Sequence, residues 1–196
     1  LSAERAVALD PTPEHALERR GSAHFLRWIF LRVGPDSVAR ELDRAESDLL
    51  GALERNPHNA RALARLSQVF FERGDFVQAY DAAQRAYHAD AYVTRVEEIL
   101  WRLFEMAFEL ERDDEAGQWC DELRRRVPES WLQHTCTLQL LGWSTGGEPD
   151  PRKAVLAYEQ ARRTLHSLPN GPDDLELLLA GTYARAGPAH TARRLL

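Results

Sequence analysis

Apolar and polar residues alternate at helical spacing along most of this chain, but many apolar positions hold alanine. In residues 65–90, RLSQVFFERGDFVQAYDAAQRAYHAD, the second half places alanine where a core helix would hold leucine. Ala79, Ala83 and Ala86 fall at positions i, i+4 and i+7, so they share one face of a helix. Because small side chains let two helix backbones approach closely, the pattern predicts tightly crossed helices.

The same frame recurs along the chain. Alanines at equivalent positions stand at 45, 79, 116, 154 and 192, at intervals of 34, 37, 38 and 38 residues. Small or apolar residues follow each of them, for example Cys120 and Leu123 after Ala116. An internal period of this length is typical of proteins built from stacked helix pairs.

The pattern predicts a helix over residues 94–111 whose apolar face is broader than that of residues 65–90. Its apolar face is broad and holds Val96, Ile99, Leu100, Leu103, Phe104, Ala107 and Leu110, extended by Trp101 and Phe108. The remaining polar strip consists of Arg95, Glu98, Arg102, Glu105 and Glu109. A surface helix needs a narrower apolar stripe. The pattern therefore predicts a helix that is contacted from two sides.

Residues 60–93 carry the clearest copy of the repeat, and it resembles the tetratricopeptide repeat (TPR), a helix–turn–helix unit. The residues at family positions are Leu63, Leu66, Ser67 and Phe70 in the first helix, Gly74 at its end, and Phe76, Ala79, Ala83 and Ala86 in the second. Residues 173–196 match through Leu179, Ala180, Tyr183, Gly187 and Ala192. The resemblance implies an all-α fold, a right-handed α-solenoid of about five TPR-like helix–turn–helix repeats.

The repeats predict a single array over residues 1–196. We expect residues 1–11 to end a preceding repeat, followed by repeats at 14–57, 60–93, 94–128 and 130–168 and a truncated repeat at 173–196. Insertions between helices are expected around residues 34–40 and at 144–151. Neither end carries the polar cap that terminal repeats need. We therefore expect an internal piece of a longer array or of a larger protein.

Composition and charge exclude several classes of partner. The chain has 25 basic and 31 acidic residues, a net charge of −6, and no clustered basic stripe, so no nucleic-acid partner is expected. Lys153 is the only lysine, a bias that hints at a GC-rich bacterial genome. No apolar run reaches the length of a membrane span, so we expect a soluble protein with no direct membrane insertion. The cytoplasm and the periplasm both stay open.

One catalytic motif is present in residues 142–146, GWSTG, which satisfies the G-x-S-x-G pattern of a hydrolase nucleophile. That serine works only on a sharp turn between a strand and a helix. Because a helical segment precedes this motif, we interpret it as a loop. Nothing positions His166 or His190 as a base. We expect no enzyme activity, no catalytic residue and no cofactor, since nucleotide-binding motifs are also absent from the sequence.

Cys120 and Cys136 are the only cysteines. They could gather with His134 around a metal ion, or form a disulfide between successive helices in an oxidising compartment. The preferred interpretation is that both are small core residues, with no metal bound.

The resemblance also implies a binding surface, because the first helices of TPR units line a concave groove. The residues carried over, with their polar and aromatic neighbours, are Arg61, Arg65, Gln68, Phe71, Arg95, Glu98, Trp101, Arg102, Glu105 and Phe108. Arginines beside aromatic rings suit an extended peptide that carries carboxylates. Ala64 and Gln68 replace the Lys and Asn of TPR domains that clamp a chaperone's C-terminal carboxylate, so that ligand is not expected.

The resemblance therefore implies a non-catalytic scaffold that binds a protein or peptide in its concave groove. Two other roles stay open. The array could be a regulatory or docking segment of a larger enzyme, such as a kinase or glycosyltransferase. It could also be an architectural subunit that associates end to end with further copies.

Overall fold

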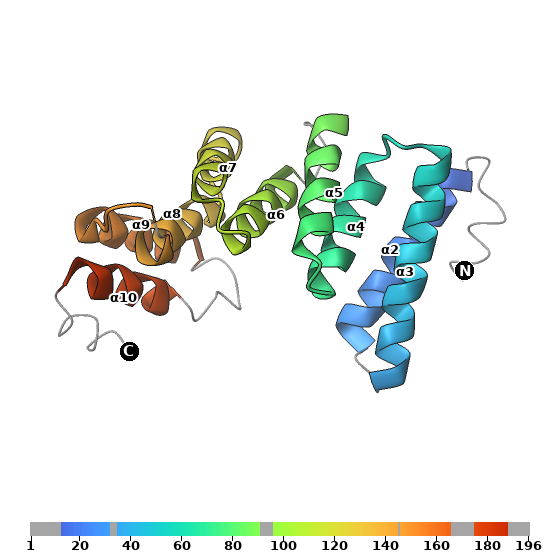
Figure 1. The fold of residues 1–196 in the computed structure, drawn as a ribbon, viewed down its shortest axis with the longest axis horizontal. Helices are drawn as coiled ribbons and strands as arrows, with labels where there is room; N and C mark the ends of the chain where they lie inside the picture. Colours follow the sequence, from blue (N-terminus) through green and yellow to red (C-terminus); the bar gives the residue numbers. More distant parts are fainter. Residues whose placement is uncertain (1–12, 32–34, 91–95, 145, 166–174, 188–196) are drawn as a thin grey trace. The chain divides into compact units, whose positions relative to one another are not determined.

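The computed structural model describes residues 13–31, 35–90, 96–144, 146–165 and 175–187. These ranges contain nine helices and no strand (Figure 1). The helices are α2 (Pro13–Leu31), α3 (Pro35–Arg55), α4 (Ala60–Glu72), α5 (Phe76–Ala89), α6 (Val96–Glu109), α7 (Asp113–Arg126), α8 (Leu132–Trp143), α9 (Pro151–Leu165) and α10 (Leu175–Ala186). The predicted all-α fold is confirmed. None of these helices combines the length and apolarity needed to cross a membrane.

The chain divides into two compact units, unit 1 (Leu1–Arg102) and unit 2 (Leu103–Leu196). In unit 1, α2 packs on α3, α3 on α4 and α4 on α5, and α2 also contacts α4. In unit 2, α7 packs on α8, α8 packs on α9, and α10 contacts both α8 and α9. These contacts join helices that follow each other in the chain, and the α2–α4 and α8–α10 contacts show that alternate helices also meet.

Four of the five alanines that define the repeat are buried. Ala45, Ala79, Ala116 and Ala154 have no exposed surface, while position 192 falls outside the described residues. Where α2 packs on α3, the small residue that permits close approach is a glycine. A Cβ atom on Gly21 would lie 2.8 Å from Leu49 Cγ. The predicted burial of the repeat alanines is confirmed at the four described positions, and Gly21 shows close helix approach between α2 and α3.

Capping residues begin both α4 and α5, and Gly74 shapes the turn between the two helices. Asn59 and Asp75 are the N-caps of the two helices, and their side chains accept hydrogen bonds from backbone N–H groups 3.1 Å away, those of Ala62 and Gln78. Gly74 adopts a φ of 75°, a left-handed conformation that residues with a Cβ rarely take. This turn matches the helix end predicted at Gly74.

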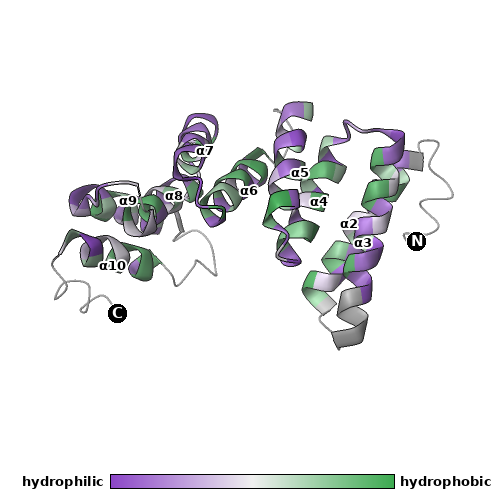
Figure 2. Cartoon of the chain, viewed as in Figure 1, coloured by the Kyte–Doolittle hydropathy of each residue, from purple (hydrophilic) through white to green (hydrophobic). Residues whose placement is uncertain are grey.

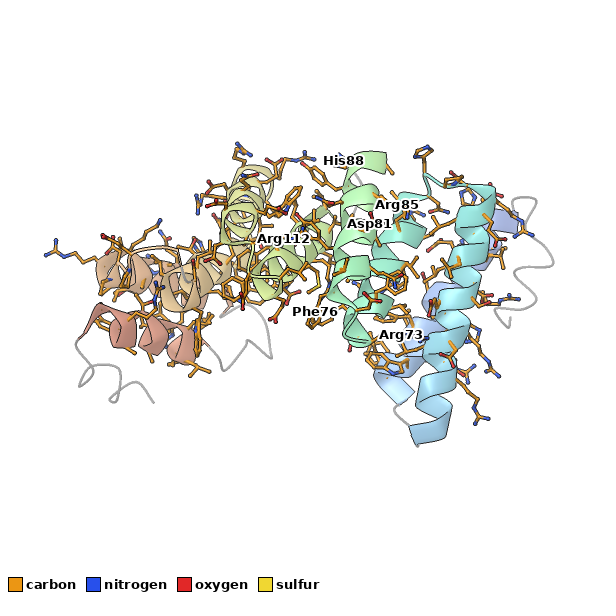
Figure 3. The ribbon with its side chains drawn as sticks, in the orientation of Figure 1. Arg73, Phe76, Asp81, Arg85, His88 and Arg112 are labelled. Carbon is orange, nitrogen blue, oxygen red and sulfur yellow. A yellow bond between two sulfur atoms is a disulfide. The ribbon has the colours of Figure 1, made fainter. Side chains whose placement is uncertain are left out.

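An ion pair also ties α4 to α3. Arg73, labelled in Figure 3, follows the last residue of α4. Its Nη2 lies 2.6 Å from Asp43 and 3.0 Å from Glu46 on α3. These side chains are partly or largely exposed, so the pairs contribute little to stability. They help to orient the end of α4.

The broad apolar face predicted for residues 94–111 is confirmed in α6. Its buried residues are Ile99, Leu100, Leu103, Phe104, Met106 and Ala107, while Glu98 and Glu109 are exposed. Colouring by hydropathy shows α6 as mainly hydrophobic and α7 as mainly hydrophilic (Figure 2). The two helices therefore follow each other in the chain with opposite character.

Two sequence interpretations are wrong. The insertion expected around residues 34–40 is largely helical, because α3 begins at Pro35. Proline is favoured in the first turn of a helix, where its missing N–H group costs no hydrogen bond. The cysteines are not separate core residues, since Cys120 and Cys136 form a disulfide with a Cα–Cα distance of 5.8 Å.

The repeat boundaries stay a prediction. Residues 1–11 lie outside the described residues, as do parts of the segments at 130–168 and 173–196. The insertion expected at 144–151 separates α8, which ends at Trp143, from α9, which begins at Pro151.

Candidate binding groove

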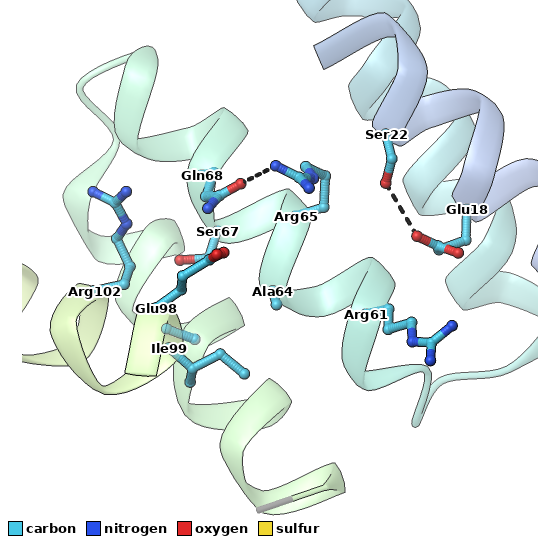
Figure 4. Close-up of a pocket in the computed structure, with 11 residues that line it drawn as sticks. Glu18, Ser22, Arg61, Ala64, Arg65, Ser67, Gln68, Glu98, Ile99 and Arg102 are labelled. Carbon is cyan, nitrogen blue, oxygen red and sulfur yellow. Dashed lines mark hydrogen bonds between the residues drawn. The ribbon is translucent and has the colours of Figure 1, made fainter. Parts of the chain in front are cut away.

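A cavity of about 340 Å³ lies in unit 1 (Figure 4). Its walls come from α2, α4, α5 and α6. The lining residues are Glu18, Ser22, Arg61, Ala64, Arg65, Ser67, Gln68, Ala83, Glu98, Ile99 and Arg102. We call this cavity the α4 pocket, because α4 contributes more of its lining than any other helix.

The helical period explains why α4 dominates the lining. Arg61, Ala64, Arg65 and Gln68 follow one another at spacings of three, one and three residues, so they share a face. The opposite face of α4 buries Leu63, Leu66 and other apolar residues. One helix thus supplies apolar anchoring on one side and charged groups on the other.

Two of the pocket arginines lie against aromatic rings. The Arg65 Cζ is 5.0 Å from the centre of the Phe25 ring, and Arg65 also donates a hydrogen bond to the Gln68 side chain. The Arg102 Cζ lies 4.0 Å from the centre of the Phe71 ring. Such cation–π contacts restrict a long side chain. Both guanidinium groups are therefore held in place before any ligand arrives.

The pocket carries a positive balance in a chain that is negative overall. Three arginines and two glutamates line it, whereas the whole chain has a net charge of −6. Glu18 is engaged locally, because its Oε1 accepts a hydrogen bond of 3.0 Å from Ser22 Oγ. Glu98 is exposed on the α6 side (Figure 4). The charge pattern favours an acidic group over the α4 side of the pocket.

The arrangement suits binding better than catalysis. A guanidinium group can donate two parallel hydrogen bonds to a carboxylate. Ala64, Ala83 and Ile99 add apolar surface between the charged groups. A cavity of this size is at the small end of the range for ligand sites, enough for a few side chains of an extended segment.

The structure gathers half of the predicted groove residues into this pocket. Those that line it are Arg61, Arg65, Gln68, Glu98 and Arg102. Phe71 lies beside Arg102, outside the lining itself. Their role in binding stays a prediction.

The other predicted residues lie elsewhere. Trp101 is half-buried and does not line the pocket, and Arg95 falls outside the described residues. Glu105 and Phe108 belong to unit 2, where the Phe108 ring lies 5.9 Å from that of Phe104. Equivalent positions in successive repeats therefore do not all serve one cavity.

The sequence interpretation missed the contribution of α2. Glu18 and Ser22 line the pocket, and Phe25 holds Arg65. Their spacing of four and three residues is the signal that could have placed them on one helix face. The irregular first repeat hid that register.

In the residues that the structure describes, the hydrolase motif lacks the strand that a nucleophile elbow requires. A helix, α8, precedes Ser144 where a nucleophile elbow requires a strand. Ser144 is buried, and its Oγ donates a 2.7 Å hydrogen bond to Asp113 Oδ2. His166 and His190 lie outside the described residues. In the part of the motif that the structure describes, Ser144 and Gly146 are held by hydrogen bonds to Asp113.

The metal alternative fails on the same kind of evidence. Cys120 and Cys136 are bonded to each other, so neither offers a thiolate to a metal ion. His134 is half-buried, and its pKa is lowered by burial and by the positive charge of Arg124. No group of three or more metal-binding side chains occurs within the described ranges.

Comparison with known proteins rests on structure. No protein-family model and no curated protein matches the sequence. Among solved structures, MamA superposes with a TM-score of 0.68 at 14% identity, covering 93% of this chain and 87% of that one. YrrB, described as a TPR protein with an unusual peptide-binding site, gives 0.67 at 16% identity, covering 100% and 89%. The fold is the TPR fold.

A third structure agrees. PilF of Pseudomonas aeruginosa superposes with a TM-score of 0.59 at 19% identity, covering 98% of this chain and 74% of that one. The TPR-like α-solenoid predicted from the repeat is thereby confirmed. At these identities the likeness concerns the fold, and it carries no information on the role of the groove residues of this chain.

Proposed function

We propose that this TPR array is a non-catalytic scaffold whose α4 pocket binds an extended protein segment carrying carboxylate groups. The observation that carries the proposal is the pair of ring-held arginines, Arg65 over Phe25 and Arg102 over Phe71, on the walls of one cavity. Arginines already restricted in the unbound protein lose less conformational entropy on binding. Within the described residues, no comparable observation favours the enzyme-docking or the end-to-end role.

The experiment is a pull-down from a lysate of the source organism, with captured proteins identified by mass spectrometry. The pocket variant carries Arg61→Glu, Arg65→Glu and Arg102→Glu. A matched control carries Arg40→Glu, Arg55→Glu and Arg85→Glu, three exposed arginines outside the pocket lining. Both variants change the net charge equally, so a difference between them reports the place of the charge.

The proposal predicts that one partner is captured by the wild type and by the control but lost by the pocket variant. Circular dichroism of both variants establishes that the helices are retained. Capture of the same partner by all three proteins would contradict the pocket as the binding site.

A further inference from the structure

Helix α7 of unit 2 has fewer fully buried residues than a helix of equal length in unit 1. Three of its fourteen residues are buried, Ala116, Cys120 and Leu123. The equally long α5 buries five residues, among them Tyr80. Burial of apolar area is the main stabilising term in helix packing. Contacts other than the burial of these three residues are therefore expected to help hold α7 on α8.

The Cys120–Cys136 disulfide crosses the α7–α8 contact near its middle. The Cα atoms are 5.8 Å apart, inside the span of roughly 4.4–6.8 Å that disulfides use. Cys120 is 1% exposed and Cys136 is fully buried. These are the only cysteines of the chain, so no other pairing within it competes.

Polar contacts hold α7 on either side of the disulfide. At its first residue, Asp113 Oδ2 accepts hydrogen bonds from Ser144 Oγ at 2.7 Å and from the Gly146 N–H at 3.0 Å. Near its end, Arg124 donates a hydrogen bond of 3.3 Å to Thr137 Oγ1. Both are partly solvated and add modest stability. The disulfide is the one contact of the three that water cannot replace.

We propose that the Cys120–Cys136 disulfide is a structural cross-link that holds α7 on α8, so that unit 2 is complete only in its oxidised form. Bond formation removes two protons and two electrons from the two thiols. The electrons pass to the disulfide of a thiol oxidoreductase, which is reduced to its dithiol. A dithiol reductant reverses the exchange and is itself oxidised to a disulfide.

Because both cysteines are buried, this disulfide is less accessible to reductants than a disulfide on the protein surface. Thiol–disulfide exchange requires a thiolate to reach a sulfur atom, so the fully folded unit resists reduction. Bonds of this kind persist in oxidising compartments. The complete form of this chain therefore belongs to such a compartment, and this inference does not depend on the ligand of the α4 pocket.

The test begins with the thiol content of the purified wild-type chain. Alkylation in denaturant, followed by mass spectrometry, is expected to modify no cysteine before treatment with dithiothreitol and two cysteines afterwards. Two reactive thiols in the protein as isolated under air would overturn the proposal.

Hydrogen exchange then compares the oxidised and reduced wild-type proteins. Exchange of the amides of residues 116–126 is expected to accelerate at least about tenfold on reduction. The amides of residues 60–89, in unit 1, are expected to change less than about twofold and serve as the internal control. Unchanged exchange in α7, or an equal acceleration in both segments, would contradict the local role.

A double variant with Cys120→Ser and Cys136→Ser provides the second measurement. It is expected to match the reduced wild type in α7 and to be insensitive to dithiothreitol. A variant that keeps the slow α7 exchange of the oxidised protein would overturn the proposal. Since reduction alone changes no other atom, the first comparison holds even if this variant folds poorly.

Discussion

Helices α4 and α5 are held together by different contacts from those between α7 and α8, although the four helices are similar in length. Helix α4 buries seven residues, among them Leu63, Leu66 and Phe70, and α5 covers them with a stripe of small side chains. The buried residues of α8 are Gln133, Thr135, Cys136, Thr137, Leu138 and Gly142, most of them polar or small. The two contacts thus differ in kind, because apolar burial is extensive between α4 and α5, whereas a disulfide and polar contacts join α7 to α8.

The largest expected effect breaks the apolar pair. Leu66→Ala, at a side chain that is 3% exposed, should lower the free energy of opening α4–α5 by about 2–5 kcal/mol, because it leaves a cavity. Hydrogen exchange of the α4 and α5 amides measures this. Val77→Ala, at a 62% exposed site on α5, should change it by less than about 0.5 kcal/mol. Equal effects at the two sites would show that apolar burial does not hold this pair.

A smaller effect should follow from removing the polar contact of the second pair. Asp113→Ala removes the acceptor for Ser144 Oγ and the Gly146 N–H, and it should lower the stability of α7 on α8 by about 1–2 kcal/mol. The matched control is Asp114→Ala, which removes the same charge from the same helix turn at an exposed position. Hydrogen exchange of the α7 amides compares them, and identical losses would mean that only the helix-end charge matters.

The smallest expected effect is a pH dependence confined to the second pair. Burial and the charge of Arg124 lower the pKa of His134 below its ordinary value of 6.5 in the folded chain. The unfolded chain therefore binds the proton more readily, and stability is lost as the pH falls below about 6.5.

The measurement is hydrogen exchange of the α8 amides across this pH range, corrected for the intrinsic pH dependence of exchange, in the wild type and in His134→Gln. The variant should be less sensitive to acid than the wild type. The same pH dependence in both proteins would assign the effect to another group.

Much of the fold could be predicted because the residues that define the repeat are also residues that the fold buries. The alanines at 45, 79, 116 and 154 are buried, and the broad face of α6 is buried as expected. Gly74 takes the left-handed conformation that its place at a helix end predicts. These features depend on short-range spacing along one helix, which a sequence displays directly.

The predictions that failed depend on long-range or ambiguous information. Proline suits both a loop and the first turn of a helix, so the start of α3 at Pro35 was misread as an insertion. The disulfide depends on the relative rotation of α7 and α8, which spacing alone leaves open. Predicting the whole lining of the pocket requires the register of α2, where the repeat is least regular. Glu18 and Ser22 were therefore missed.

The most direct test of the proposed function measures binding of the purified chain to immobilised peptide pools. The pools are acidic, neutral or basic and otherwise matched, and each is tested at low and high salt. Because the chain is negative overall, simple charge attraction would favour the basic pool. We predict at least about tenfold stronger binding to the acidic pool, weakened by salt and lost in the variant with Arg61, Arg65 and Arg102 changed to Glu. A preference for basic peptides, or an acidic preference that survives in the variant, would contradict the account.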